Sequence, residues 1–470
     1  MLITRNYVWC KLSCEYLNVH QVLDDELAVT VDGYWFSDAY KNGTWDGKHR
    51  FYYARTGRFL AGLLDQVLSL LDKHFPDQYV EVVDNRSAPF VQPPYKKSAI
   101  SLRPYQKEAV QKILECKNCV LHAATNSGKT EVAIELIRRL GLPTTYIVHR
   151  KELMYQTAER MREKLNIKIG MIGDGICELE DVTIVMPKSV ITSTYDPISR
   201  SRLKHMKKGL ETLLSNQVMF LDECHNLKDS YINWFVRHSN SYYRFAMSGT
   251  PFMNDVVTNR ELIGLFGETA YHISNMDLIK LHISSEPTCF FYKMESTEVF
   301  DMDYETSYKM NIVENTERNR AITRMVKKFN SVNLNVLILV REIVHGATLQ
   351  AMFGAPFIHG SLSSEVRQNA IKRFKASKGK SLIASTILDE GVDIANIDVL
   401  ILAAGGKSPK RLLQRIGRGL RKKESNRLLV IDFLDTADEY TLNHSIQRAD
   451  TVKAEGFRTK LLKPSDLDNF

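Results

Sequence analysis

The sequence predicts an α/β protein in which two lobes, each built on a parallel β-sheet, follow a small α+β domain. Three observations lead to this prediction: the chain length, apolar runs that alternate with helical patterns, and a proline-rich stretch at residues 87–104. At 470 residues, the chain is several times the ~100–200 residues of one domain. Because proline disfavours regular elements, we place the first domain boundary near residue 90.

Two series of short apolar runs follow that boundary, and each alternates with segments of helical periodicity. Such alternation is typical of parallel strands joined by crossover helices, with the sheet covered on both faces. The first series comprises residues 119–123, 144–148, 182–186, 218–221 and 243–247, and the second comprises 336–340, 381–384, 399–402 and 428–432. We therefore predict an accessory domain (1–90), a first lobe (91–270), a hinge region (271–330), a second lobe (331–440) and a C-terminal tail (441–470).

The composition is that of an ordinary globular protein, with 44% hydrophobic and 25% charged residues, and it excludes wholesale disorder. The net charge of +8 suits a polyanionic partner. The seven cysteines, odd in number and irregularly spaced, argue against a disulfide framework. Cys116, Cys119 and His122 resemble half a zinc site, but no second pair follows and structural zinc needs four ligands. Since no apolar run approaches the ~18 residues of a membrane span, we expect a cytoplasmic protein.

A candidate phosphate-binding loop lies between the run at 119–123 and a helical pattern that begins at Glu131. A strand, a loop of small residues and a helix N-terminus cradle an anion, because backbone N–H groups point at it. Alanine replaces the first glycine of the usual pattern, and Asn126 tolerates left-handed backbone. A chance Gly-Lys-Thr turn is the alternative. Lys129 is predicted to neutralise the terminal phosphates and Thr130 to ligate Mg²⁺. The predicted nucleotide-binding residues of the loop are Ala124, Thr125, Asn126, Ser127, Gly128, Lys129 and Thr130.

Two adjacent carboxylates, Asp222 and Glu223, directly follow the apolar run at 218–221. They are therefore expected at the carboxyl edge of a buried strand, where ligands bind in open α/β sheets. We predict that Asp222 holds Mg²⁺ and that Glu223 polarises an attacking water. Paired acidic residues are common on surfaces, but a pair that ends a buried strand downstream of a phosphate loop indicates nucleotide hydrolysis.

These motifs resemble, in type and order, those of the superfamily-two helicases over residues 101 to about 435. Asp222 to His225 resemble motif two. The resemblance implies two RecA-like lobes that form a helicase motor and hydrolyse ATP at their interface. Residues 102–106 resemble the element whose glutamine reads adenine, so Gln106 is the candidate for base selection. Residues 248–251 resemble motif three, which couples the ATP site to the nucleic-acid track through hydroxyl hydrogen bonds.

Residues 414–421 resemble motif six of the same superfamily, and three of them, Gln414, Arg418 and Arg421, are candidate catalytic residues. Arg418 and Arg421 lie three apart, so they share one face of a helix. The resemblance implies that they act as arginine fingers, a role worth about 10³ to 10⁵ in rate. The alternative is a solvated basic helix, which we assign only to the flanking lysines.

The resemblance also places a nucleic acid across the strand ends of both lobes. Phosphate contacts give affinity without sequence information, as a motor requires. Residues 384–393 resemble motif five, to which we assign nucleotide contacts by Gly391 and Asp393. Any single track candidate could equally be an ordinary surface residue. The candidates, each just past a predicted strand, are His149, Arg150, Lys188, Ser189, Arg341 and Thr386.

The first 90 residues lie outside these motifs and combine aromatic residues with cations. Trp45, Lys48 and Arg50 are predicted to stack on bases and contact a backbone. In the alternative interpretation the aromatics fill the core of a small domain, for which Tyr34, Phe36, Phe51 and Tyr53 are suitably spaced. The pattern of residues 32–34 and 43–47 resembles the N-terminal domain of the UvsW-type branch-migration helicases of tailed bacteriophages, which implies branched DNA.

Together these features predict an ATP- and Mg²⁺-dependent DNA helicase or translocase for replication, recombination or repair. It would act on forks and four-way junctions and move along a single-stranded track. We expect a monomer without membrane contact, located in the host cytoplasm if a phage encodes it. One alternative keeps the motor but makes it an RNA helicase or a restriction-system translocase. A non-enzymatic ATP-gated clamp is disfavoured, because Lys129, Glu223, Arg418 and Arg421 are all present.

Overall fold

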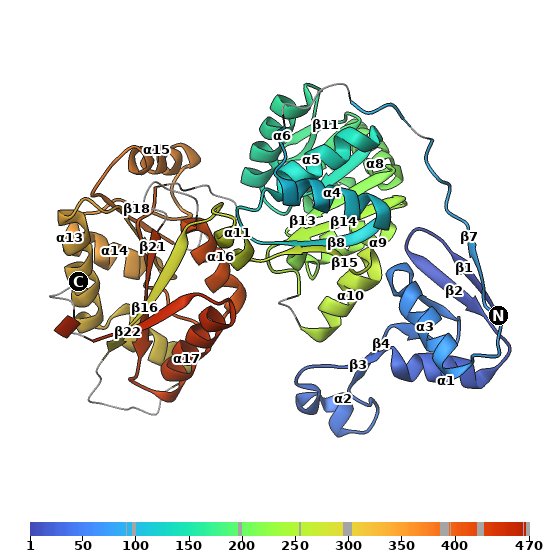
Figure 1. Ribbon diagram of the computed structural model, residues 1–470, viewed down its shortest axis with the longest axis horizontal. Helices are drawn as coiled ribbons and strands as arrows, with labels where there is room; N and C mark the ends of the chain where they lie inside the picture. Colours follow the sequence, from blue (N-terminus) through green and yellow to red (C-terminus); the bar gives the residue numbers. More distant parts are fainter. Residues whose placement is uncertain are drawn as a thin grey trace. The chain divides into compact units, whose positions relative to one another are not determined.

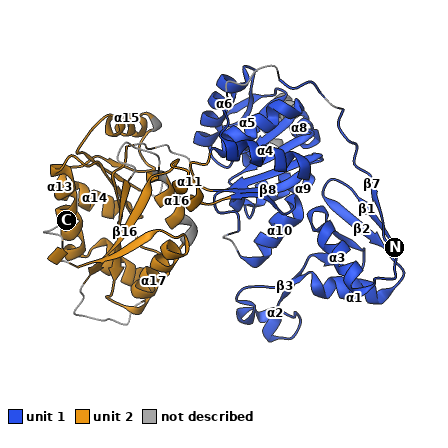
Figure 2. Cartoon of the chain, in the orientation of Figure 1, with its two compact units in different colours: residues 1–123, 128–272 blue, residues 124–127, 273–470 orange. Residues whose placement is uncertain are grey.

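The computed structural model describes the chain except residues 91, 96–99, 196–199, 253–254, 295–302, 386–393, 395, 421–426, 464 and 467–470. The described residues form two compact units, 1–123 with 128–272 and 124–127 with 273–470 (Figure 2). The predicted fold class is confirmed. Each unit contains a large sheet, and a small α+β domain precedes the first large sheet (Figure 1).

The large sheet of the first unit has eight strands in the order β11-β10-β12-β9-β13-β14-β8-β15. The strands from β10 to β8 pair in parallel. The central strand β13 is buried along its whole length, as expected for a parallel strand covered on both faces. The strands are β8 (Asn118–Ala123), β9 (Thr144–Ile147), β10 (Gly170–Gly173), β11 (Ile176–Glu178), β12 (Val182–Val185), β13 (Val218–Asp222), β14 (Tyr243–Ser248) and β15 (Thr269–Ile273).

Seven helices accompany these strands among the described residues of the first unit. The helix after β8 begins at the predicted phosphate loop, and the helix after β14 follows the segment that resembles motif three. The helices are α4 (Pro104–Cys116), α5 (Lys129–Leu140), α6 (Lys151–Leu165), α7 (Pro187–Tyr195), α8 (Arg200–Ser215), α9 (Ser230–His238) and α10 (Val256–Phe266).

The N-terminal domain has its own five-stranded sheet, in the order β5-β6-β2-β1-β7, and a separate two-stranded hairpin of β3 and β4. The hairpin carries the short helices η1 (Tyr34–Phe36) and α2 (Asp38–Lys41). The remaining elements are β1 (Leu2–Arg5), β2 (Trp9–Ser13), α1 (Leu17–Glu26), β3 (Ala28–Thr30), β4 (Lys48–Arg50), β5 (Tyr52–Tyr53), β6 (Arg58–Leu60), η2 (Ala61–Leu63), α3 (Leu64–His74) and β7 (Glu81–Asp84).

The N-terminal domain packs directly on the first lobe, and one apolar cluster contains core residues of both. Leu60 lies against Gly264 of α10, where a Cβ would come within 2.5 Å of the leucine side chain. Arg260 of α10 donates a hydrogen bond to Gln66. The domain is therefore part of the first compact unit, and its removal would expose apolar surface of the lobe.

The second unit is built on a seven-stranded sheet in the order β18-β19-β17-β20-β21-β16-β22. Its strands are β16 (Glu286–Met294), β17 (Val336–Leu339), β18 (Phe357–Ile358), β19 (Ser381–Ala384), β20 (Val399–Leu402), β21 (Arg427–Asp435) and β22 (Arg458–Leu462). Its helical segments are α11 (Asn275–Lys280), α12 (Tyr304–Tyr308), η4 (Lys309–Val313), α13 (Thr316–Ser331), α14 (Ile343–Phe353), α15 (Ser364–Lys375), α16 (Pro409–Gly419) and α17 (Glu439–Ala454).

Two predicted boundaries differ from this arrangement. Residues 273–330 belong to the second unit rather than to a hinge region, since β16 pairs in parallel with both β21 and β22. The predicted tail forms most of α17 and all of β22. Arg448 of α17 is buried and pairs with Asp432 at 2.9 Å, so this segment belongs to the lobe. Within the described part of the chain, no helix is both long and apolar enough to cross a membrane.

Candidate active site

Parallel register brings three predicted motifs to one edge of the first sheet. Strand β14 lies between β13 and β8. Asp222 at the end of β13 is opposite Met247, and Ser248 at the end of β14 is opposite His122 of β8. The carboxylate pair, the segment that resembles motif three and the phosphate loop therefore follow neighbouring strand ends.

The loop between β8 and α5 has the backbone of a phosphate cradle. Asn126 has a φ of +70°, which bears out the left-handed conformation considered for it. Gly128 precedes the first turn of α5 with a φ of +79°, and a Cβ there would come within 2.4 Å of Gln106 Nε2. The buried Gln106 thus lies against the loop, where it accepts a hydrogen bond from the Arg103 backbone N–H at 2.9 Å. Lys129 donates to the Ala123 carbonyl oxygen at 3.2 Å.

Asp222 is buried beside a tyrosine that the sequence reasoning missed. Tyr146 of β9 is fully buried and donates its hydroxyl to Asp222 Oδ2 at 3.0 Å. Burial, together with the adjacent charge of Glu223, raises the pKa of Asp222 to about 6. The charge of Lys129 and the Tyr146 hydrogen bond oppose that rise. Lys129 and Tyr146 therefore favour the ionised form of Asp222, which is the form that binds a divalent cation.

Glu223 is held in an unusual conformation that directs it towards motif three. Its φ is +50°, which is costly for a residue with a side chain. Its backbone N–H donates to Asp222 Oδ1 at 3.0 Å, and its carboxylate accepts from the Ser248 hydroxyl at 3.3 Å. The fully buried His225 places Nδ1 2.8 Å from the same hydroxyl. The Thr250 backbone N–H donates to that hydroxyl at 3.0 Å.

These side chains suit a nucleoside triphosphate with Mg²⁺. The N-terminus of the 12-residue helix α5 and the Lys129 ammonium supply positive charge for phosphate. Thr130 in the first turn and Asp222 offer the oxygen ligands that Mg²⁺ prefers. A bound Mg²⁺ would neutralise charge that develops on the phosphates. The geometry thus joins a phosphate cradle to a buried carboxylate and to a second carboxylate bonded to motif three.

We expect Tyr146→Phe to raise the Mg²⁺ concentration for half-maximal ATP turnover severalfold. Loss of the hydroxyl removes the donor to Asp222 Oδ2, so the carboxylate is oriented less firmly. Tyr155→Phe is the matched control, because the exposed Tyr155 also donates to an aspartate, Asp174, at 3.0 Å. An unchanged Mg²⁺ dependence in Tyr146→Phe would show that the hydroxyl has only a structural role.

The first-unit candidates for the nucleic-acid track follow two adjacent strands. Strands β9 and β12 pair in parallel, with Ile147 opposite Val185. His149 and Arg150 follow β9 and are half-buried, whereas Lys188 is exposed at the start of α7 and Ser189 is half-buried beside it. The four residues thus follow neighbouring strand ends of one sheet edge.

Only part of the predicted second-lobe site lies among the described residues. Arg341 follows β17, is 3.2 Å from Glu342 and lies over the Tyr308 ring at 4.9 Å. It lines a cavity of about 170 Å³ with Lys407 and Arg448, which gives this pocket a cationic lining. The backbone of positions 414 and 418 lies in α16. Thr386, Gly391, Asp393, Arg421 and the side chains of Gln414 and Arg418 lie outside the described structure.

Two of the three predicted DNA contacts in the N-terminal domain are already bonded within it. Arg50 pairs with Asp24 at 2.8 Å and with Asp46 at 2.6 Å. The half-buried Trp45 donates its indole N–H to the Lys48 carbonyl oxygen at 2.8 Å. Lys48 is exposed, whereas Trp45 and Arg50 are half-buried and stabilise the β3–β4 hairpin; the DNA contacts of all three stay a prediction.

The aromatic core considered as the alternative is only partly correct. Phe51 is buried, but Phe36 is 73% exposed and Tyr53 is 48% exposed. Strand alternation predicted which residues share a face, but it could not show that Phe36 lies in a short helix at the hairpin tip. The exposed rings become candidates for contacts with a partner.

Comparison with known proteins agrees with this order of features. Residues 99–253 match the family described as "Type III restriction enzyme, res subunit", and residues 317–423 match "Helicase conserved C-terminal domain". The chain is 23% identical to the DNA 3'-5' translocase XPB2 of Sulfurisphaera tokodaii, over 76% of this chain and 87% of that protein. It is 22% identical to the ATP-dependent DNA helicase uvsW of Enterobacteria phage T4, over 95% of this chain and 96% of that protein.

A solved structure of S. cerevisiae Dbp5 bound to RNA and ADP BeF3 supports the two-lobe fold. It covers 80% of this chain and 92% of its own, with a TM-score of 0.55 and 16% identity. The Dbp5 likeness concerns the fold alone, whereas the similarity to the phage helicase extends over nearly the whole chain. With both helicase domains matched in the order of the motifs, the chain belongs to the superfamily-two helicases and is an ATP-hydrolysing enzyme.

Proposed function

We propose that this helicase acts on DNA, and that it unwinds or branch-migrates forks and four-way junctions in replication, recombination or repair. The observation that carries the choice of a branched substrate is an exposed aromatic cluster on the hairpin of the N-terminal domain. The T4 relative, named as a DNA helicase, aligns over 95% of this chain, whereas the archaeal translocase aligns over 76%. We therefore expect the N-terminal domain to contribute to the choice of substrate.

In the proposed hydrolysis, Lys129 holds the terminal phosphates while Thr130 and Asp222 hold Mg²⁺. Glu223 orients the attacking water and accepts its proton, which is the role of a positioned base. Because Ser248 bonds to Glu223 at 3.3 Å, a change in the charge of Glu223 alters a hydrogen bond within motif three. This contact offers a physical route from hydrolysis to the nucleic-acid track.

The aromatic cluster lies at the tip of the β3–β4 hairpin and consists of Tyr34, Trp35, Phe36 and Tyr40. The Tyr34 ring contacts Trp35 at 5.2 Å and Tyr40 at 4.6 Å, both edge-on. Trp35 is 53% exposed and Phe36 is 73% exposed. Exposed aromatic rings stack on bases without regard to sequence, and unpaired bases occur where a junction opens. The exposed Lys48 of β4 can add a phosphate contact.

Two other substrates also find support among the comparisons. The Dbp5 structure contains RNA, and the first lobe matches a restriction-enzyme family. An RNA helicase would prefer duplex RNA to junction DNA, and a restriction translocase would move on duplex DNA without preference for a branch. The aromatic cluster favours the branched substrate, because stacking requires exposed bases.

We expect the double variant Trp35→Ala, Phe36→Ala to bind and process four-way junctions at least about tenfold more weakly, since stacking is worth about 1–3 kcal/mol per base. ATP turnover stimulated by single-stranded DNA should stay close to wild type. The control is Tyr79→Ala, Phe90→Ala, which removes two rings that are even more exposed and lie outside the hairpin. Equal losses in both assays, or unchanged junction unwinding, would remove the cluster from substrate recognition.

A further inference from the structure

One face of the N-terminal sheet is only partly covered by the first lobe. In β2, Cys10 and Leu12 point into the core, and the alternate residues Lys11 and Ser13 are exposed. Helices α1 and α3 contribute buried residues to the same apolar cluster as Cys10 and Leu12. The core side of the sheet is thus closed. The other side is exposed at Lys11 and Ser13 and is covered at Leu60, which packs on Gly264 of α10.

Strand register places two cations opposite each other on the open face. Lys11 of β2 pairs with Arg58 of β6, and Tyr53 of β5 also pairs with Arg58. Like charges directly opposite each other destabilise an antiparallel pair. Among the described residues, the ion pairs of this domain use other cations, namely Arg50, Lys73, His74 and Arg86. Lys11 and Arg58 are therefore kept together without a carboxylate to balance them.

A third cation joins this pair through a tight turn. Residues 54–57 connect β5 to β6, and the Gly57 carbonyl accepts from the Leu12 N–H at 2.8 Å. Gly57 has a φ of +67°, and a Cβ there would come within 2.1 Å of the Leu12 carbonyl oxygen. Only glycine therefore lets the turn lie against β2. Arg55 lies in this turn and is exposed.

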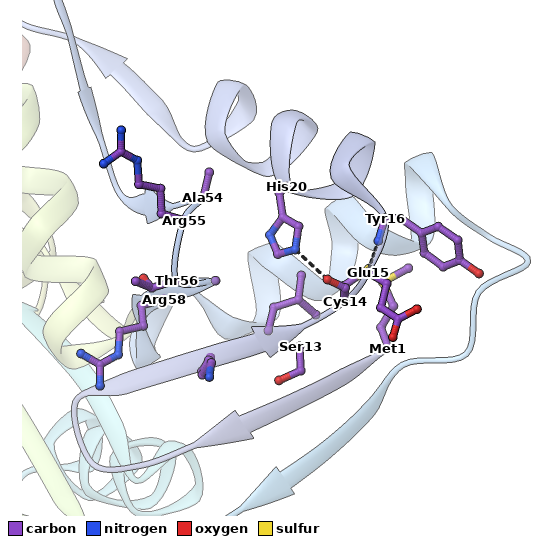
Figure 3. A pocket seen from close by; sticks show the side chains of 13 residues that line it. Met1, Ser13, Cys14, Glu15, Tyr16, His20, Ala54, Arg55, Thr56 and Arg58 are labelled. Atoms are coloured by element: carbon purple, nitrogen blue, oxygen red, sulfur yellow. Dashed lines mark hydrogen bonds between the residues drawn. The ribbon is translucent and has the colours of Figure 1, made fainter.

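These three cations line an open pocket of about 920 Å³. Figure 3 shows Arg55 and Arg58 at one side of the pocket and Glu15 and Tyr16 at the other, with His20 between them. His20 is bonded to the Tyr52 hydroxyl and to the Cys14 carbonyl oxygen, so it belongs to the wall. Glu15 is the only carboxylate of the lining, so the pocket is suited to an anion.

The open face also leads towards the motor. Tyr53 is half exposed and contacts the Trp9 ring at 5.9 Å. Trp9, on the same face of β2 as Lys11, lies under the Arg237 guanidinium of α9 at 5.6 Å. Cations interleaved with aromatic rings along one surface are typical of nucleic-acid binding. The surface begins at the pocket and ends at the first lobe.

We propose that this open face, formed by Lys11, Arg55, Arg58 and Tyr53, binds the phosphodiester backbone of a duplex DNA arm. The proposal rests on the proposed function, because only a branched substrate has a duplex arm outside the motor track. Bound phosphates would offset the repulsion between Lys11 and Arg58. They would also hold the arm against the domain that packs on α10, beside the segment that resembles motif three.

The test compares Lys11→Thr, Arg58→Thr with the control Lys73→Gln, Lys112→Gln, in which two exposed lysines with surface carboxylate partners lose the same charge. Binding of a blunt duplex and of a single strand of equal length is measured by fluorescence anisotropy over a range of salt concentrations. Each lost phosphate contact lowers the slope of log K against log salt by about 0.9 on B-DNA. We expect the slope for the duplex to fall by about 2 in the threonine variant and to change less in the control.

Thermal unfolding separates a binding role from a structural one. The threonine variant should unfold at the same temperature as wild type or higher, because a repulsive pair is removed and threonine suits a strand. Lys11→Glu should create an attractive pair with Arg58, raise the unfolding temperature and weaken duplex binding at least tenfold. An unchanged duplex slope, or a loss confined to single strands, would overturn the proposal. If the wild type itself fails to process junctions, the proposed function fails instead.

Discussion

Glu223→Gln is expected to reduce ATP turnover by about 10² to 10⁴, the usual contribution of a positioned base, while ATP affinity stays within severalfold of wild type. The amide keeps the size of the side chain and can still bond to Ser248, but it cannot accept a proton from water. Lys129→Ala should lose both turnover and ATP affinity. Lys129 neutralises charge in the ground state as well as in the transition state, so its loss weakens binding.

Single-turnover hydrolysis and equilibrium binding of a fluorescent ATP analogue separate these two roles. Glu108→Gln is a suitable control, because Glu108 is an exposed residue of α4 paired with Lys112. Near-wild-type hydrolysis by Glu223→Gln would falsify the assignment of the base. Equal loss of ATP affinity in both variants would mean that Glu223 acts mainly in nucleotide binding.

Arg418→Ala and Arg421→Ala are each expected to reduce DNA-stimulated turnover by about 10³ or more. A group that stabilises charge mainly in the transition state alters the rate far more than ground-state binding. Affinities for ATP and for DNA should therefore stay within severalfold of wild type.

The control for the arginine variants is Arg320→Ala, which removes an exposed arginine of α13 that pairs with Glu317. Turnover is measured with saturating single-stranded DNA, and DNA binding is measured separately. Full turnover combined with lost DNA affinity would reassign Arg418 and Arg421 to the nucleic-acid track.

The sequence was most informative where function depends on strand ends. The predicted runs at 218–221 and 243–247 correspond to β13 and β14, so Asp222 and Ser248 could be placed at a sheet edge. The left-handed conformation of Asn126 was also foreseeable, because few other side chains tolerate it. Each of these predictions depends on a local feature of the chain, namely strand alternation, a turn or a helix N-terminus.

Contacts between distant segments were not predictable in the same way. Tyr146 reaches Asp222 across 76 positions, and Arg50 meets Asp24 across 26. Both contacts depend on strand order and register, which no local pattern specifies. The opposed pair Lys11 and Arg58 has the same origin.

The predicted hinge shows a related difficulty. Strand β16 lies within the predicted hinge region, and its pairing with β21, more than a hundred residues later, decides which lobe it joins. The proline-rich stretch marks the end of the N-terminal domain in the sequence. The packing does not separate that domain from the first lobe, because one apolar cluster contains core residues of both. Point variants therefore test the role of this domain better than its deletion.

The most direct test of the proposed function is ATP turnover and strand separation by the full chain on a panel of nucleic acids. The panel comprises single-stranded, duplex, forked and four-way-junction DNA, together with the RNA equivalents of the single strand and the duplex. We expect turnover to be stimulated by DNA and strand separation to be fastest on forks and junctions. Preferential stimulation and unwinding by duplex RNA, or equal activity on branched and unbranched DNA, would contradict the proposal.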